Sequence, residues 1–357
     1  MSRIPLQYPE IDEDLATSFF HEEDGVVRFT WPEAGVVLSH PLSKGRKADA
    51  KTSWYVDPHD IKAESGDIRI FEDYGVAAGN FAEFAVFEPW VGNPVDRRAW
   101  TRLGPVEASL GDPSPLMQYV FASTLYSNDL ADGWYGIHTI RLFGVWTPDI
   151  ERRLLQALLT FRTRLQAELR ICHLSEPDIY SDPEPVAGSH ELFAPEFCVA
   201  DTEVLHLFYA AELADDVEFA FLQFYRVLEF YSALSAIDRL ASVRWDRSLS
   251  SAEFLRQATS AVNRDERSAL SELIAKTTSP ASLQKAQALG LVKATSAEAF
   301  ANALYDFRNS VVHAKYDMRA KMHVARVLQG NPAVQGWKEL ARAAASDAMR
   351  TLGERDQ

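Results

Sequence analysis

The chain is poor in the features that mark several common classes of protein. Its 357 residues include only two cysteines, Cys172 and Cys198, whose spacing fits neither a metal site nor a disulfide framework. Charged residues interrupt every apolar run well before the roughly 20 residues that cross a bilayer. The segment 1–20 carries four acidic residues and no apolar core, so we expect no signal peptide. These absences together predict a cytoplasmic protein with no membrane partner.

The local motifs of several enzyme classes are missing too. The sequence contains no Gly-x-x-x-x-Gly-Lys-Ser/Thr phosphate loop, no His-Glu-x-x-His zinc helix, no Gly-x-Ser-x-Gly nucleophile elbow and no Gly-x-Gly-x-x-Gly dinucleotide turn. The histidines are scattered, so we expect no metal and no cofactor. A site assembled from residues far apart in the sequence stays open.

The net charge of −15 is unevenly distributed along the chain. Residues 1–200 carry 17 Lys and Arg against 31 Asp and Glu, whereas residues 201–357 carry 19 against 20. So acidic a chain argues against a protein that coats nucleic acid. The stretch 308–326 nevertheless has five Lys or Arg residues and one Asp, and such a strip can position one phosphate backbone. A solvated helix face is the alternative interpretation of this strip.

Two halves of the chain differ in their apolar periodicity. Residues 25–150 contain short runs of Val, Ile, Phe, Tyr and Trp separated by Gly, Pro and Asp, which is typical of a mostly antiparallel sheet or sandwich. The expected strands are 25–31, 35–40, 53–56, 67–71, 81–87, 118–123 and 136–146. A helix over 149–171 follows, with an apolar face made of Leu154, Leu155, Leu158, Phe161, Leu165 and Leu169.

The second half is expected to be helical throughout. We place a β-rich N-terminal domain at 1–175, a Pro-rich linker at 176–198 and an all-helical domain at 199–357, so the fold class is α+β. One long helix is expected over 216–237. The expected helix starts further on are the capping boxes Ser250-x-x-Glu253 and Thr295-x-x-Glu298 and an Asn263 cap.

The most informative stretch is Arg308-Asn309-Ser310-Val311-Val312-His313, near the end of the helix that starts close to Thr295. An apolar stripe about 80° wide should face the core, and it consists of Phe300, Leu304, Phe307, Val311 and Ala314. Asn302, Tyr305, Asn309, Val312, His313 and Tyr316 fall on the opposite side, with Arg308 at the flank. Tyrosines amid sparse charge favour a contact surface, and an ordinary helix–helix contact is the alternative.

Arg308 and His313 have complementary chemistry. Arginine is a permanent cation, and histidine is the side chain that exchanges protons near neutral pH. Asn309 and His313 are four residues apart on one helix and can touch. This set is the minimum needed to cleave RNA without a metal.

These residues give the helical half a resemblance to the HEPN superfamily, whose members carry an Arg-Asn-x-x-x-His motif on a late helix. Here the motif is Arg308, Asn309 and His313, flanked by 304–307 and 314–315, and an earlier helix over 224–231 also looks typical. The resemblance covers roughly residues 200–357. It implies an all-helical domain that forms a homodimer through the motif helix, with Arg and His of both protomers in one cleft. The domain would be a metal-independent endoribonuclease or a non-catalytic relative.

In such a nuclease the RNA 2′-hydroxyl attacks the adjacent phosphorus, which leaves a 2′,3′-cyclic phosphate and a 5′-hydroxyl. His313 would serve as general base or acid, and Arg308 would stabilise the phosphoryl charge. Asn309 would orient His313 or bond a phosphate oxygen. Tyr305 or Tyr316 would stack a splayed base, and Lys315 and Arg319 would position the backbone.

The resemblance also suggests an acidic residue on an earlier helix that supports the Arg–His pair. Glu229 is our candidate, and an i,i+3 ion pair with Arg226 is the alternative.

Three functions remain open from the sequence. The first is an RNase with a defence or toxin-like role, whose N-terminal domain senses a trigger or recruits a partner. The second is a non-enzymatic dimerising adaptor. The third is a sensor of a small ligand, which a pocket in the N-terminal sheet would favour.

Overall fold

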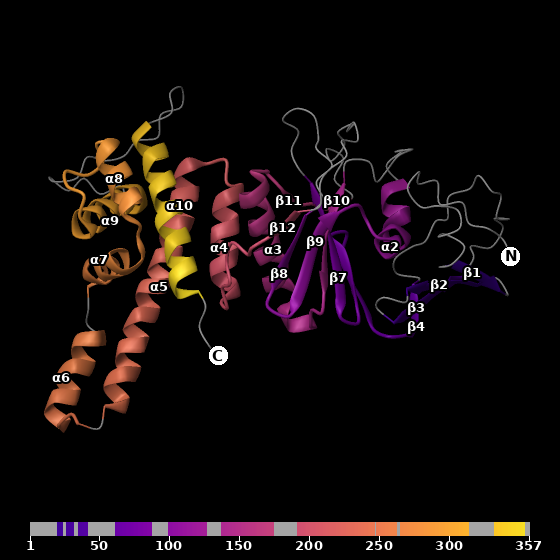
Figure 1. Ribbon diagram of the computed structural model, residues 1–357, viewed down its shortest axis with the longest axis horizontal. Coiled ribbons are helices and arrows are strands. Elements are labelled where there is room, and N and C mark those ends of the chain that lie inside the picture. Colours follow the sequence, from indigo (N-terminus) through magenta and orange to yellow (C-terminus); the bar gives the residue numbers. More distant parts are fainter. Residues whose placement is uncertain are drawn as a thin grey trace. The chain divides into compact units, whose positions relative to one another are not determined.

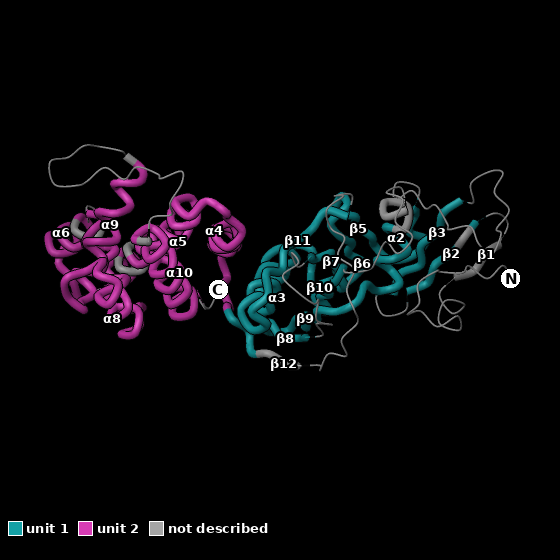
Figure 2. Tube along the Cα trace, turned by 90° about the horizontal axis from the view of Figure 1, so that it is seen from above, with its two compact units in different colours: residues 1–196 teal, residues 197–357 magenta. Residues whose placement is uncertain are grey.

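The computed structural model describes residues 20–23, 26–31, 35–41, 61–87, 99–126, 137–174, 191–246, 248–262, 265–313 and 332–353. The chain divides into two compact units, residues 1–196 and 197–357, which Figure 2 colours separately. An antiparallel β-rich part is followed by a helical part (Figure 1), so the α+β fold class predicted from the sequence is confirmed. In the part of the chain that the structure describes, no helix combines the length and the apolar character needed to cross a membrane.

The N-terminal unit contains two sheets. The first has the antiparallel order β1-β2-β3-β4, with β1 Phe20–Glu23, β2 Val26–Trp31, β3 Val36–Pro41 and β4 Lys62–Ser65. The second has the order β12-β8-β9-β10-β7-β6-β5, with β11 also paired to β7. Its strands are β5 Ile68–Phe71, β6 Gly75–Ala78, β7 Phe81–Phe87, β8 Ala99–Leu103, β9 Val106–Gly111, β10 His138–Phe143, β11 Arg170–Ile171 and β12 Glu191–Phe193. The β12–β8 pair is parallel, and the other pairs are antiparallel.

The two faces of the larger sheet are covered differently. Helix α3 (Ile150–Leu165) packs on β8, β9 and β10. Because side chains alternate along a strand, this face carries Leu103, Ala108, Leu110, Ile140 and Leu142, which are all buried. Leu154, Leu155, Leu158 and Phe161 of α3 are buried too. Part of the other face, over β6 and β7, belongs to a separate apolar cluster.

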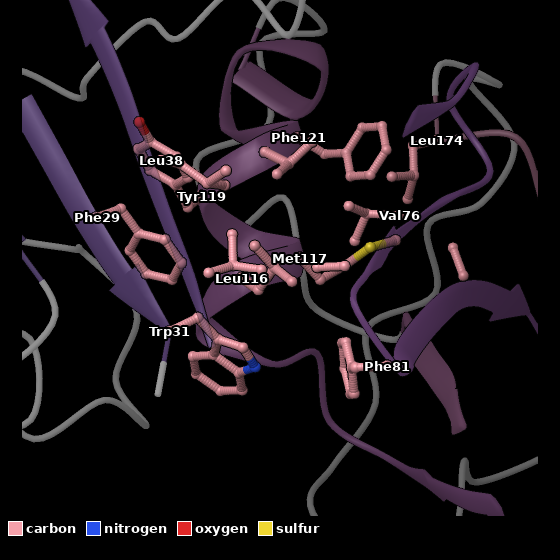
Figure 3. Close-up of a cluster of buried hydrophobic side chains, with 14 of the residues drawn as sticks. Phe29, Trp31, Leu38, Val76, Phe81, Leu116, Met117, Tyr119, Phe121 and Leu174 are labelled. Carbon is pink, nitrogen blue, oxygen red and sulfur yellow. The ribbon is translucent and has the colours of Figure 1, made fainter. Parts of the chain in front are cut away.

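Figure 3 shows this second cluster, which joins the two sheets through helix α2 (Pro115–Tyr126). Phe29 of β2 stacks on Tyr119 of α2, with 4.7 Å between the ring centroids. Leu116 and Met117 of α2 are buried in the same cluster as Phe81 of β7. Burial of this apolar surface is what holds α2 and the smaller sheet to the larger one.

The prediction of a strand over 118–123 is wrong, because this segment lies within α2. Leu116, Met117, Val120 and Phe121 are buried. Because these residues are adjacent or four apart in the sequence, they lie on one side of a helix. Pro115 begins the helix, and the Ser114 hydroxyl accepts a hydrogen bond from the Met117 amide (3.2 Å), as an N-cap does. The β-branched and aromatic residues of a helix buried on several sides resemble those of a strand.

Several predicted boundaries also need correction. The helix expected over 149–171 ends at Leu165, because Gln166 adopts a left-handed conformation with φ 52°. Residues 170–171 then pair with β7 as β11. The expected strand 53–56 lies outside the described residues. Strands β8 and β9 were not predicted.

The C-terminal unit is a bundle of helices. They are α4 Thr202–Leu213, α5 Val217–Trp245, α6 Ser251–Val262, α7 Glu266–Thr277, α8 Pro280–Ala288, α9 Ala297–His313 and α10 Pro332–Leu352. Helix α5 is longer than the predicted 216–237, and it packs against α4, α6, α7, α9 and α10. The buried alanines of α10, at 341, 344, 345 and 348, give α10 an apolar face of small side chains.

The caps of three helices were predicted, and for one of them the Ser250 half of the capping box is as expected, whereas the Glu253 carboxylate accepts from Arg256 and Gln257 in the described structure. The Glu253 amide donates to the Ser250 hydroxyl (3.2 Å) at the start of α6. Helix α9 is capped by Ser296, whose hydroxyl accepts from the Ala299 amide (3.1 Å), and Thr295 lies one residue too early. Asp265 caps α7, whereas Asn263 lies outside the described residues.

A matched pair of substitutions on α9 tests which face of this helix is buried. The Phe300 side chain is fully buried, whereas Val312 is 46% exposed. We expect Phe300→Ala to lower the free energy of unfolding of the helical unit by about 3–5 kcal/mol, because it leaves a cavity. Val312→Ala should change it by less than about 0.5 kcal/mol.

Urea unfolding followed by circular dichroism at the helix band measures both values. Equal losses of stability in the two variants would contradict the orientation of α9.

Candidate functional site

Helix α9 carries the Arg-Asn-x-x-x-His motif on its last two turns. Its buried side is fixed by aromatic contacts with two neighbouring helices. Phe307 meets Phe221 of α5 edge to face, with centroids 4.7 Å apart, and stacks on Trp337 of α10 at 5.5 Å. Such ring pairs set the rotation of α9 about its axis. That rotation places Arg308 at the boundary with α5 and α7.

Arg308 is held by hydrogen bonds on both sides of its guanidinium. Its Nη2 donates to Oε1 of Glu229 on α5 (2.9 Å), and its Nη1 donates to Oδ1 of Asn309 (3.0 Å). The Arg308 side chain is 21% exposed. The residue proposed from the sequence as acidic support is therefore in direct contact with Arg308. Arg226, the alternative partner of Glu229, donates to Gln223 at 3.5 Å.

A second carboxylate and a tyrosine complete the cluster. Glu266, in the first turn of α7, has Oε1 3.9 Å from Arg308 Nη2. The same oxygen accepts a hydrogen bond from the Tyr225 hydroxyl (3.1 Å), and the Arg308 guanidinium lies 5.6 Å from the centroid of the Tyr225 ring. Three helices thus converge on one arginine. We call Tyr225, Glu229, Glu266 and Arg308 the arginine cluster.

The electrostatics of this cluster are unbalanced, because two carboxylates face one guanidinium. Burial raises the pKa of Glu229 above its ordinary value of 4.5. The charge of Arg308 opposes this shift, and the charge of Glu266 and its hydrogen bond with Glu229 add to it. Burial, and next the charge of Glu266, raise the pKa of Tyr225, so its hydroxyl remains protonated and a donor.

Tyr305 lies beside a different arginine. The guanidinium of Arg267, on α7, is 4.8 Å from the centroid of the Tyr305 ring and also pairs with Asp306. Arg267 therefore covers one face of the ring that was expected to stack on an RNA base. A base would have to use the other face or displace Arg267.

The rest of the predicted site is only partly described. His313 is the last residue of α9, and its side chain lies outside the described part of the structure. Lys315, Tyr316 and Arg319 also lie outside it, as does Ala314 of the predicted apolar stripe. Among the side chains that the structure does describe, no group of three or more His, Cys, Asp or Glu stands together as a candidate metal site.

Two members of the arginine cluster were missed from the sequence. Tyr225 was not singled out, although its spacing of four from Glu229 puts both residues on the same side of α5. Glu266 gave no signal beyond its place at a helix start, where a negative charge is favourable. Its contact with Arg308 spans 42 positions in the sequence and is set by the packing of α7 on α9.

Comparison of the chain with protein-family models, with curated proteins and with solved structures found no match.

The raised pKa of Glu229 predicts an unusual pH dependence of stability. The folded state favours the protonated carboxyl, so the contribution of Glu229 is fully present below pH 4.5 and decreases as the pH rises above it. Glu229→Gln resembles the protonated form. We expect the stability of this variant relative to that of the wild type to increase as the pH rises from 4 to 7, whatever the offset caused by the lost charge, measured by urea unfolding at each pH.

Glu253→Gln is the matched control, since hydrogen bonds from Arg256 and Gln257 lower the pKa of Glu253 to about 2. The contribution of Glu253 is present above pH 4.5 and is lost as the pH falls toward 2. This variant should therefore lose stability relative to the wild type as the pH rises from 2 to 4.5, and the difference should stay nearly constant above pH 4.5. Trends of the same sign in both variants would contradict the arginine cluster as described.

Proposed function

We propose that this protein is a metal-independent endoribonuclease of the HEPN type, with Arg308 and His313 as catalytic residues. The observation that carries the proposal is the state of Arg308: it is oriented by Glu229 and Asn309 and is still partly exposed. A guanidinium has five N–H donors. The two bonds just named use two of them, which leaves three donors for the oxygens of a phosphate.

His313 follows Arg308 by five residues on the same helix. At 1.5 Å per residue, their Cα positions differ by about 7.5 Å along the axis of α9. This separation suits a division of labour along one phosphodiester: His313 takes the proton from the 2′-hydroxyl or gives one to the leaving oxygen, and Arg308 stabilises the equatorial oxygens. Asn309 can bond the phosphate or orient His313, because it is four residues before the histidine.

In this mechanism Glu229 is a positioning residue. The flexible side chain of an arginine loses conformational entropy when it binds a phosphate. A fixed carboxylate lowers that cost, because it holds the guanidinium in place before the phosphate binds. Glu266 faces the same guanidinium from α7, and Tyr225 of α5 donates a hydrogen bond to Glu266. The same carboxylates repel RNA, so cationic residues must supply the attraction. The four Lys and Arg residues in the sequence 309–326 provide it, with Lys315 and Arg319 as our candidates.

The proposed assembly is a homodimer through α9, with RNA as substrate and a defence or toxin-like role in the cell. Val312, 46% exposed on the side of α9 away from Phe300, is suited to such a contact. The N-terminal unit would then receive a protein or small-ligand trigger. The proposed location is the cytoplasm.

An RNA cleavage assay in EDTA tests the nuclease. The wild type should cleave mixed cellular RNA and leave 2′,3′-cyclic phosphate and 5′-hydroxyl ends, identified by mass spectrometry. His313→Ala should lower the single-turnover rate by about 10²–10⁴-fold through loss of proton transfer. Arg308→Ala should lower it by about 10²–10³-fold through loss of charge stabilisation.

The control is Arg256→Ala, because Arg256 is an exposed arginine on α6 that pairs only with neighbouring α6 residues in the described structure. It should cleave at the wild-type rate. Expression of the wild type, but not of His313→Ala, should arrest growth. An inactive wild type, or full activity in His313→Ala, would refute the nuclease.

The ion pair between Arg308 and Glu229 also supports a second function. A guanidinium that ties α9 to α5 stabilises the fold without any chemistry, so the motif could serve a non-catalytic dimerising adaptor. Sedimentation of the wild type and of Val312→Asp tests this alternative. A dimer that dissociates in the variant, together with an inactive wild type, would favour the adaptor over the nuclease.

A further inference from the structure

One row of residues crosses the face of the larger N-terminal sheet that α3 does not cover. The register pairs Glu83 of β7 with Arg141 of β10, Arg141 with Ser109 of β9, and Ser109 with Trp100 of β8. Residues paired across antiparallel strands place their side chains on the same face. With strands about 4.8 Å apart, Arg141 and Trp100 are separated by about 10 Å at the backbone, with Ser109 between them.

A cavity of about 200 Å³ lies at this row. Its lining includes Trp100, Ser109, Gly111, Asp112 and Arg141. An apolar cavity of about 150 Å³ is large enough for benzene, so this one can hold a single substituted ring. Trp100 is 43% exposed although it is a tryptophan on a sheet face, and an exposed indole offers a flat surface on which a ring can stack.

Arg141 is the polar group of the cavity that the fold leaves unsatisfied. Its guanidinium makes no hydrogen bond within the described structure, and because its Nε is closed off by protein, a ligand in the cavity would meet the Nη donors beside Gly111. The neighbouring Glu83 does not fill this role, since its carboxylate accepts hydrogen bonds from the Ser114 amide (2.8 Å), the Ser114 hydroxyl and the Thr139 hydroxyl (2.6 Å). An acceptor on a ligand would gain a charge-assisted hydrogen bond from these Nη donors.

Gly111 is what allows the guanidinium of Arg141 to lie there. A Cβ at position 111 would come within 3.1 Å of Arg141 Nη2, which is closer than side chains normally approach. The missing side chain at Gly111 on β9 therefore makes room for the unpaired guanidinium of Arg141 on β10. An alanine at 111 would require the guanidinium to shift by a few tenths of an ångström without removing its charge.

The charges of the lining select the kind of ligand. Asp112 lines the same cavity as Arg141, and the charge of Arg141 also acts on the buried carboxyl of Glu83 beside it. The chain as a whole is acidic, with a net charge of −15. An anion is thus not favoured over a neutral molecule. The remaining requirements are a flat ring for Trp100 and a hydrogen-bond acceptor for Arg141.

We propose that this cavity is a binding site for a small neutral heteroaromatic ring with a carbonyl or ring-nitrogen acceptor, such as a nucleobase or a nicotinamide. The ring stacks on Trp100, and its acceptor takes the hydrogen bond from Arg141. The site would give the N-terminal unit a ligand of its own. This binding does not depend on the proposed nuclease, and either can fail without the other.

Saturation-transfer NMR on the full-length protein tests the site, with uracil, cytosine and nicotinamide as probes. Benzene, which has no acceptor, acetamide, which has no ring, and benzoate, which is an anion, are the controls. We expect at least one of the three heteroaromatic probes to bind more tightly than every control. Arg141→Gln and Trp100→Ala should each weaken the binding of that probe by about tenfold or more.

Arg102→Gln is the matched control variant, because Arg102 lies on the same strand as Trp100, is exposed and pairs with Glu107. It should bind like the wild type. Gly111→Ala should weaken binding while retaining every charged group, and thermal unfolding identifies any variant that has lost its fold. The proposal is overturned if no heteroaromatic probe binds, if benzoate binds more tightly than they do, or if folded Arg141→Gln and Gly111→Ala bind as well as the wild type.

Discussion

The contact between Arg308 and Glu229 is the interaction on which the helical unit's candidate site depends. It joins the motif helix α9 to the long helix α5, and Glu266 brings α7 to the same point. A partly buried guanidinium that lost its carboxylate would leave a charge without compensation, which is costly in a protein interior. The orientation of the motif is therefore determined by the packing of three helices and not by α9 alone.

This arrangement imposes a conflict that the proposed chemistry has to resolve. The carboxylates that orient Arg308 also weaken the local attraction for a phosphate, and burial already raises the pKa of Glu229. Partial protonation of Glu229 would free part of the positive charge of Arg308 for a ligand. The N-terminal unit contains a different case in Arg141, whose guanidinium makes no hydrogen bond within the described structure and whose neighbour Glu83 accepts its hydrogen bonds from hydroxyl and amide donors. A guanidinium can thus be available to a ligand in two ways. A carboxylate can orient it, as Glu229 orients Arg308, or its donors can be left without hydrogen bonds in the described structure, as in Arg141.

The sequence predicted those features that depend on local periodicity. The apolar stripe of α9 placed Phe300 and Leu304 in the core, where the structure has both fully buried, and the α+β division followed from the change of pattern along the chain. Helix α2 was mistaken for a strand because a helix buried on several sides has the composition of a strand. Glu266 and Arg141 could not be found in advance, because their environments are created by helix packing and by strand register between distant segments.

A double-mutant cycle on the single-turnover rate of RNA cleavage in EDTA tests the central claim most directly. The claim is that Glu229 acts by positioning Arg308. Glu229→Ala should therefore slow cleavage in the wild-type background and have no further effect in the Arg308→Ala background. If the two substitutions instead lower the rate independently, so that their effects multiply, Glu229 does not act through Arg308 and the account is wrong.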